Sequence, residues 1–179
     1  MSNGANLAFR KEVLKKIDAD KLQTHTASGD DMFLMLEVKR VFGPTSILFL
    51  KNENHFVSTP AVKTWKDLLE QRIRWVSKSN HYKDGFLLAS SWIIFLQNLA
   101  LVLILLASLF YTPLFHTLIY IWILKALIDF AFLQNICKFS SQKKLLKLYP
   151  LMALIYPFFI SYTAIIGQFA SFSWKGRKY

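Results

Sequence analysis

The chain has 179 residues, of which 54% are hydrophobic and 16% aromatic, with only 6 Gly and 5 Pro; this composition excludes a disordered or fibrous protein. The sole cysteine, Cys137, excludes an internal disulfide and a cysteine metal cluster. The net charge is +11, but the excess base lies beside long apolar runs, where it suits anionic lipid headgroups or the positive-inside bias, so we expect no nucleic-acid partner.

Charge divides the chain into two expected domains. Residues 1–85 carry 14 Lys or Arg and 10 Asp or Glu, a balance of +4. Residues 86–179 carry 8 bases and one acid, Asp129, a balance of +7. We therefore expect a polar domain over 1–85 and a membrane domain over 86–179.

The polar half is predicted to be α/β. A small-residue turn leads into an amphipathic helix in "GANLAFRKEVLKKI" (4–17), and Ser28 is expected to cap a helix in "SGDDMFLMLEVKRVF" (28–42). Two short strands are expected in "SILFLK" (46–51) and "HFVST" (55–59), rich in β-branched and aromatic residues. A helix starting at Thr59 and Pro60 is expected to run through "QRIRW".

Three segments of the second half are long and apolar enough for a bilayer, namely 86–111, 117–136 and 148–173. The second contains Lys125 and Asp129, four residues apart and hence on one helix face. They are interpreted as an internally neutralised pair facing other helices, the alternative being a transport path. In the third segment, Pro157 predicts a kink or a re-entrant course.

Basic residues predict the orientation. The short loop "KFSSQKKLLK" belongs on the cytoplasmic side, and two crossings place the polar half there too. The basic tail "SWKGRKY" prefers the same side, although three full crossings would place it opposite. Either one segment does not span or the tail is an exception. No secretory signal is recognised at the start, so something else must deliver the chain to the membrane. We expect an integral membrane protein with a cytoplasmic polar half, in a bacterial inner membrane.

Two clusters carry candidate chemistry. Asp30 and Asp31 lie at an expected helix start, where acids also serve simply as caps. Gln71, Arg74 and Trp75 share one predicted helix face, with Arg72 expected to point elsewhere. An arginine suits phosphate oxygens and a tryptophan ring suits a sugar face, but the same residues also anchor interfacial helices.

The chain has a pair of acids, then Q-x-x-R-W about forty residues later, and then membrane helices. It thereby resembles the membrane-bound family 2 glycosyltransferases, in which these features occur in the same order. That family includes ceramide glucosyltransferases and cellulose, chitin and hyaluronan synthases. The stretch "GANLAFRKEVL" is similar to the G-x-N-x-x-x-R stretch of bacterial members, and "WKGRKY" resembles the ending of ceramide glucosyltransferase-like members.

The resemblance implies a partial GT-A-like domain, its acceptor side, followed by about three transmembrane or re-entrant helices. It assigns Asp31 as general base with Asp30 as its neighbour. Gln71, Arg74 and Trp75 would close over the donor diphosphate and cradle the acceptor, and Asn6 would lie in the turn before the acceptor site. The implied reaction is inverting transfer from a nucleotide-sugar donor to a lipid or glycan acceptor.

One family element is not found in these 179 residues. Family members hold a divalent cation, Mg or Mn, and the donor through a D-x-D element ahead of the acceptor site. Asp18 and Asp20 have that spacing but follow the "GAN" turn, so they are interpreted as a solvated helix end and no residue is proposed as a metal ligand. The alternative is a non-catalytic truncated or split membrane protein that needs a partner carrying the donor-binding half.

Overall fold

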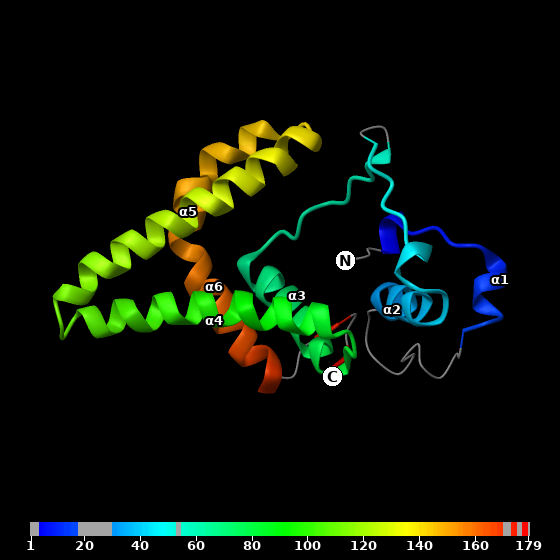
Figure 1. Ribbon diagram of the computed structural model, residues 1–179, viewed down its shortest axis with the longest axis horizontal. Coiled ribbons are helices and arrows are strands. Elements are labelled where there is room, and N and C mark those ends of the chain that lie inside the picture. The colour runs from blue at the N-terminus through cyan, green and yellow to red at the C-terminus, as the bar shows by residue number, and fades with distance from the viewer. Residues whose placement is uncertain (1–3, 18–29, 53–54, 170–172, 175–176, 179) are drawn as a thin grey trace. The chain divides into compact units, whose positions relative to one another are not determined.

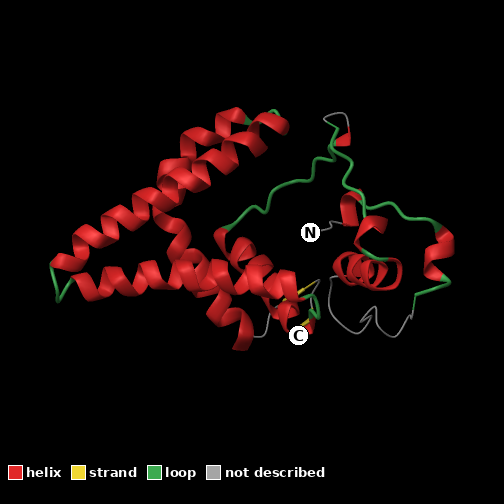
Figure 2. Cartoon of the chain, in the orientation of Figure 1, coloured by secondary structure: helices red, strands yellow, loops and turns green. Residues whose placement is uncertain are grey.

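The computed structural model describes residues 4–17, 30–52, 55–169, 173–174 and 177–178. Most of them are helical, as Figure 2 shows. The chain divides into two compact units, one formed by Met1–Asp84 with Ala170–Tyr179 and the other by Gly85–Phe169. The first unit therefore combines the polar half with the basic tail, which had been expected to belong with the membrane segments.

The first unit is built from short helices and loops (Figure 1). Its elements are η1 (Gly4–Asn6), α1 (Lys11–Leu14), α2 (Asp30–Phe42), η3 (Pro44–Ser46), α3 (Trp65–Ser77), η5 (Lys78–His81), β1 (Ser173–Trp174) and β2 (Arg177–Lys178). The two-residue strands pair in antiparallel fashion, with Ser173 opposite Lys178.

The prediction of strands at 46–51 and 55–59 is wrong. Ser46 ends η3, and in the described parts of both segments the chain forms loop instead of a ladder. Leu48 and Phe49 are 90% and 79% exposed, so the apolar pattern has no buried face. Residues that favour strands form one only where a neighbouring strand can pair with them and a core can bury one of their faces. Within the described ranges, β1 and β2 are the only strands that pair. The α/β architecture is thus not found.

The first predicted helix is much shorter than 4–17. Its region contains η1 and the single turn α1, while Phe9 and Leu14 remain exposed and Ile17 is buried. A helix this short is marginal without packing of its apolar face. Helix α2 lies where the sequence predicts it and buries Phe33 and Leu34; the predicted cap, Ser28, lies outside the described residues.

Helix α3 begins at Trp65, six residues after the predicted start at Thr59. The Thr64 hydroxyl accepts a hydrogen bond from the Asp67 backbone N–H at 3.1 Å and so caps the helix. Both Thr59–Pro60 and the Thr64–Asp67 spacing are valid start signals, and the second also places an acid in the first turn. The helix therefore starts at the stronger local signal.

The second unit contains three long helices, α4 (Gly85–Ser108), α5 (Pro113–Phe139) and α6 (Tyr149–Phe169), with the short helix η6 (Lys143–Leu148) before the last. All three are long and apolar enough to cross a membrane, which makes the chain a membrane protein. Helix α4 packs against both α5 and α6, as Figure 1 shows. The three predicted apolar helices are therefore present, with α5 starting earlier because Pro113 suits a first helical turn.

Pro157 lies inside α6, which continues through it. A proline has no backbone N–H, so the carbonyl of the residue four positions earlier, Ala153, loses its normal helical donor. The indole Nε1 of Trp122 in α5 donates to this carbonyl at 3.0 Å. The proline thus frees an acceptor that a neighbouring helix satisfies, as a membrane interior requires.

The predicted Lys125–Asp129 pair is present. The Lys125 ammonium bonds to the Asp129 carboxylate, and Lys125 is only 8% exposed. Its Nζ also lies 5.5 Å from the ring centroid of Tyr156 in α6. These contacts agree with the interpretation of an internally neutralised pair that faces another helix.

Candidate functional site

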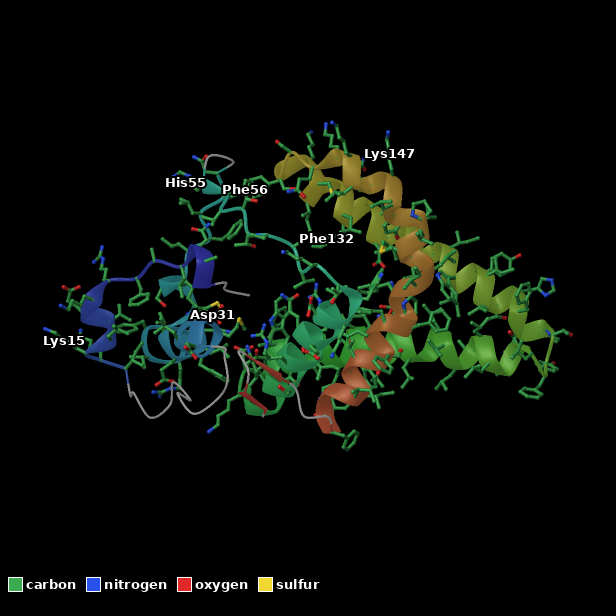
Figure 3. The ribbon with its side chains drawn as sticks, turned by 180° about the vertical axis from the view of Figure 1, so that it is seen from behind. Lys15, Asp31, His55, Phe56, Phe132 and Lys147 are labelled. Atoms are coloured by element: carbon green, nitrogen blue, oxygen red, sulfur yellow. The ribbon has the colours of Figure 1, made fainter. Side chains whose placement is uncertain are left out.

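Asp31 lies in the first turn of α2 and is partly buried (Figure 3). Its Oδ2 accepts a hydrogen bond from the Gly4 backbone N–H at 2.9 Å, and its Oδ1 accepts one from the Met32 N–H at 2.8 Å. The carboxylate is therefore held from both sides, by its own helix and by a turn 27 residues earlier in the chain. Asp30, next to it, is exposed.

The "GAN" turn forms η1 and is joined to two other parts of the first unit. Through Gly4 it contacts Asp31, and through the Asn6 side-chain amide it donates to the His55 carbonyl at 3.0 Å. A Cβ at Gly4 would lie 3.9 Å from the Asp31 Cβ, an ordinary contact distance. The predicted Asn6 thus positions the loop around His55 while its neighbour Gly4 holds Asp31.

Helix α3 carries the Q-x-x-R-W residues. Arg74 is 8% exposed, Gln71 is half-buried and Trp75 is exposed. The guanidinium carbon of Arg72 lies 4.5 Å from the centroid of the Trp75 ring, so the expectation that Arg72 points elsewhere is wrong. Residues three apart on a helix are neighbours, and a cation over an indole face is favourable. Arg72 and Trp75 therefore form one stacked unit.

Electrostatic coupling links the acid pair to the end of α3. Burial lowers the pKa of Lys78 from its ordinary value, the positive charge of Arg74 lowers it further, and the negative charges of Asp31 and Asp30 partly offset this. Burial also lowers the pKa of Arg74. Lys78 thus lies within reach of the charges of Arg74, Asp31 and Asp30, and both cations are desolvated.

Tyr82 borders the same region. Burial raises the pKa of its phenol, and the charge of Asp31 raises it further. Its ring centroid lies 5.9 Å from that of Phe33 in α2. Six residues after Phe33 in α2, Lys39 forms an ion pair with Asp84. Helix α2 is therefore fixed against the segment that follows α3, and this packing keeps Asp31 close to Lys78 and Tyr82.

This arrangement can accept a proton and stabilise an anion. Each carboxylate oxygen of Asp31 has two lone pairs, and one on each oxygen is engaged by a backbone N–H, so acceptor capacity remains. A buried guanidinium offers several donors to phosphate oxygens, and an ammonium adds a point charge. These residues could therefore provide a general base beside an anionic leaving group.

The described residues do not fit a divalent cation. Among them, no group of three or more His, Cys, Asp or Glu side chains lies close enough to hold a metal ion. Asp18 and Asp20 lie outside the described residues. No chemical step is accordingly routed through a metal.

Three groups in this region were not predicted from the sequence, namely Lys78, Tyr82 and the backbone N–H of Gly4. Lys78 could have been found, because it stands four residues after Arg74 on the same helical face. Tyr82 lies beyond α3 and carries no periodic signal, and the Gly4 N–H contacts Asp31 across 27 residues. Such contacts depend on tertiary packing, which local spacing does not encode.

Comparison with known proteins gives no relative for this site. No family model, no curated protein and no solved structure matches the chain.

Proposed function

We propose that the chain supplies the acceptor side of an inverting membrane glycosyltransferase of family 2 type. It would transfer a sugar from a nucleotide-sugar donor to a lipid or polysaccharide acceptor. The observation that carries the proposal is the Asp31 carboxylate, which two backbone N–H groups orient and whose charge acts on Lys78, the same ammonium on which the charge of Arg74 acts. Three apolar helices in the same chain favour an acceptor that resides in the membrane.

In the proposed reaction, Asp31 takes the proton of the acceptor hydroxyl as its oxygen bonds to the anomeric carbon of the donor sugar. The bond from that carbon to the nucleoside diphosphate breaks on the opposite face, so the configuration inverts. The diphosphate leaves with increased negative charge, which the Arg74 guanidinium stabilises. The exposed ring of Trp75, stacked by Arg72, offers a flat platform for a sugar.

The orientation forms part of the proposal. The basic loop around η6, with Lys143, Lys144 and Lys147, favours the cytoplasmic side of a bacterial inner membrane. Nucleotide sugars are available on that side, so the site of the first unit would face its donor there. In residues 1–179 the D-x-D spacing of Asp18 and Asp20 follows the "GAN" turn, whereas family members have their donor-binding element ahead of the acceptor site, so the assay preserves the native cellular context.

The test uses membranes from three kinds of cell: one in which the chromosomal gene for this chain is deleted, one in which it is restored, and one in which it encodes a variant. They are incubated with a panel of radiolabelled uridine- and guanosine-diphosphate sugars, and label is measured in lipid extracts and in polymer. Restoration should return incorporation from at least one donor. Arg74→Gln should lower it about 100-fold, the typical effect of removing one donor to a developing oxyanion.

Lys16→Gln is the control, because Lys16 lies exposed just after α1 in the same unit. It should leave incorporation near the wild-type rate. Equal incorporation in deleted and restored membranes for every donor would favour the non-catalytic alternative. Undiminished transfer by Arg74→Gln, at equal protein level, would remove Arg74 from the mechanism.

A further inference from the structure

A second surface of the first unit has no part in the proposed reaction. Between η3 and α3 the chain forms a long loop, whose described parts are residues 47–52 and 55–64. Leu48, Phe49 and Leu50 are 90%, 79% and 65% exposed. Phe56 and Val57, further along the loop, are also more than half exposed. Figure 3 shows Phe56 and His55 on this loop, and the His55 carbonyl accepts a hydrogen bond from Asn6, in the turn whose Gly4 holds Asp31.

The exposed side chains of this loop indicate whether protein or lipid would cover it. Successive side chains of an extended segment point in opposite directions. Leu48, Phe49 and Leu50 are consecutive and all highly exposed, so apolar surface faces both sides of the backbone. A protein groove would cover one side, whereas the hydrocarbon of a bilayer surrounds an inserted loop on every side. The geometry therefore suits lipid better than a protein groove.

The flanking charges suit lipid as well. From residue 44 to residue 66 the chain has three lysines, at 51, 63 and 66, and a single acid, Glu53. Lys51 directly follows the apolar run, and Lys63 and Lys66 flank Trp65, which is 67% exposed. Lysines attract anionic headgroups, and tryptophan favours the interface between headgroups and hydrocarbon. The loop thus has apolar side chains that could enter hydrocarbon, lysines that could contact headgroups and a tryptophan that suits the interface between the two.

The membrane is also close along the chain. The short helix η5, which directly follows α3, ends at His81, and the first apolar helix begins at Gly85. The first unit is therefore tethered at a membrane surface by three intervening residues. Insertion of the loop would cost little further loss of translational freedom, because the anchored chain is already at the bilayer.

We propose that the described parts of this loop bind a membrane, with Leu48, Phe49 and Leu50 entering an anionic bilayer and Lys51, Lys63 and Lys66 contacting its headgroups. The loop would enter by about 5–10 Å, the depth typical of interfacial elements. It would hold the first unit against the lipid surface at a second point besides the start of α4. Insertion requires no sugar transfer, although the loop is joined to the site by the hydrogen bond from Asn6 to the His55 carbonyl.

The test places a fluorescent label on single cysteines in the full chain. Cys137→Ser removes the native thiol, and Leu48→Cys then carries the environment-sensitive label. Lys15→Cys is the control, since Lys15 follows α1 in the same unit and is exposed (Figure 3). The protein is reconstituted in phosphatidylcholine, with and without phosphatidylglycerol. Brominated lipids quench labels in hydrocarbon, and aqueous iodide quenches labels in water.

We expect the label at Leu48 to emit at shorter wavelength than the label at Lys15, to be quenched by brominated lipid and to be shielded from iodide. Phosphatidylglycerol should increase this difference. Leu50→Asp, added to the Leu48 label, should restore iodide quenching, because a carboxylate resists entry into hydrocarbon. None of these signals depends on glycosyl transfer, so the proposed function can fail without affecting them.

Two results would overturn the inference. Iodide quenching at Leu48 equal to that at Lys15 would show a loop in water. Shielding from both quenchers would show a loop covered by protein.

Discussion

The backbone N–H of Gly4 and the carboxylate of Asp31 illustrate how single residues determine the site. Both carboxylate oxygens are oriented by N–H donors, which leaves the remaining lone pairs in a defined direction. The residue types of the site could be predicted from sequence, because acids at a helix start and Q-x-x-R-W are local patterns. The Gly4 contact could not, since it joins residues 27 positions apart.

Replacement of Gly4 by proline tests this orientation. Proline removes the N–H and is tolerated in the first turn of a helix, so η1 should persist. A hydrogen bond to a charged acceptor contributes about 1.5–3 kcal/mol, so the transfer rate should fall about 10- to 100-fold. Gly4→Ala keeps the N–H, and its Cβ makes only ordinary contacts. Equal rates for the two variants, measured by labelled-sugar incorporation, would argue against the orienting role.

At the scale of elements, helices followed the sequence more closely than strands did. Apolar periodicity and length predict α2 and the three long helices, because helical hydrogen bonds are local. The expected strands at 46–51 and 55–59 are loop in their described parts, because strand pairing depends on a distant partner. The spacing of Lys125 and Asp129 predicts their pairing correctly, again because an interval of four is local to a helix.

The bond from Trp122 to the carbonyl of Ala153 can be tested as a coupling between α5 and α6. Trp122→Phe leaves that carbonyl without its donor, because Pro157 supplies none. We expect the free energy of unfolding in mixed micelles to fall by about 1 kcal/mol, the range of interhelical hydrogen bonds in membranes. In a Pro157→Ala background the helix supplies its own donor, and the same Trp122→Phe change should cost less.

This double-mutant cycle uses the difference between the two costs, so the shared loss of ring packing cancels. An identical cost of Trp122→Phe in both backgrounds would mean that only packing, and not the freed carbonyl, is at stake.

At the scale of the whole molecule, the composition of the first unit bears on membrane topology. It contains residues on both sides of the three apolar helices, Met1–Asp84 and Ala170–Tyr179. Segments that share one compact unit must lie on the same side of a bilayer. We therefore expect an even number of crossings, with one of the three apolar helices lying in the membrane without traversing it. Helix length and composition alone do not distinguish these cases.

Single cysteines in a Cys137→Ser background can determine this topology. Lys15→Cys reports on the polar half and Lys178→Cys on the tail. A membrane-impermeant maleimide applied to sealed vesicles of one orientation should label both or neither. Labelling of one position without the other would establish an odd number of crossings and contradict the expectation.

The central claim is that Asp31 acts as the base of sugar transfer, and substitution by asparagine at the chromosomal locus tests it most directly. Asparagine keeps the size of the side chain but cannot take the acceptor proton. Incorporation of labelled sugar should fall about 100- to 10,000-fold, the usual contribution of a positioned general base. Glu12→Gln, at an exposed position of α1, is the control and should leave incorporation unchanged. Incorporation by Asp31→Asn at near the wild-type rate, with equal protein in the membrane, would contradict the account.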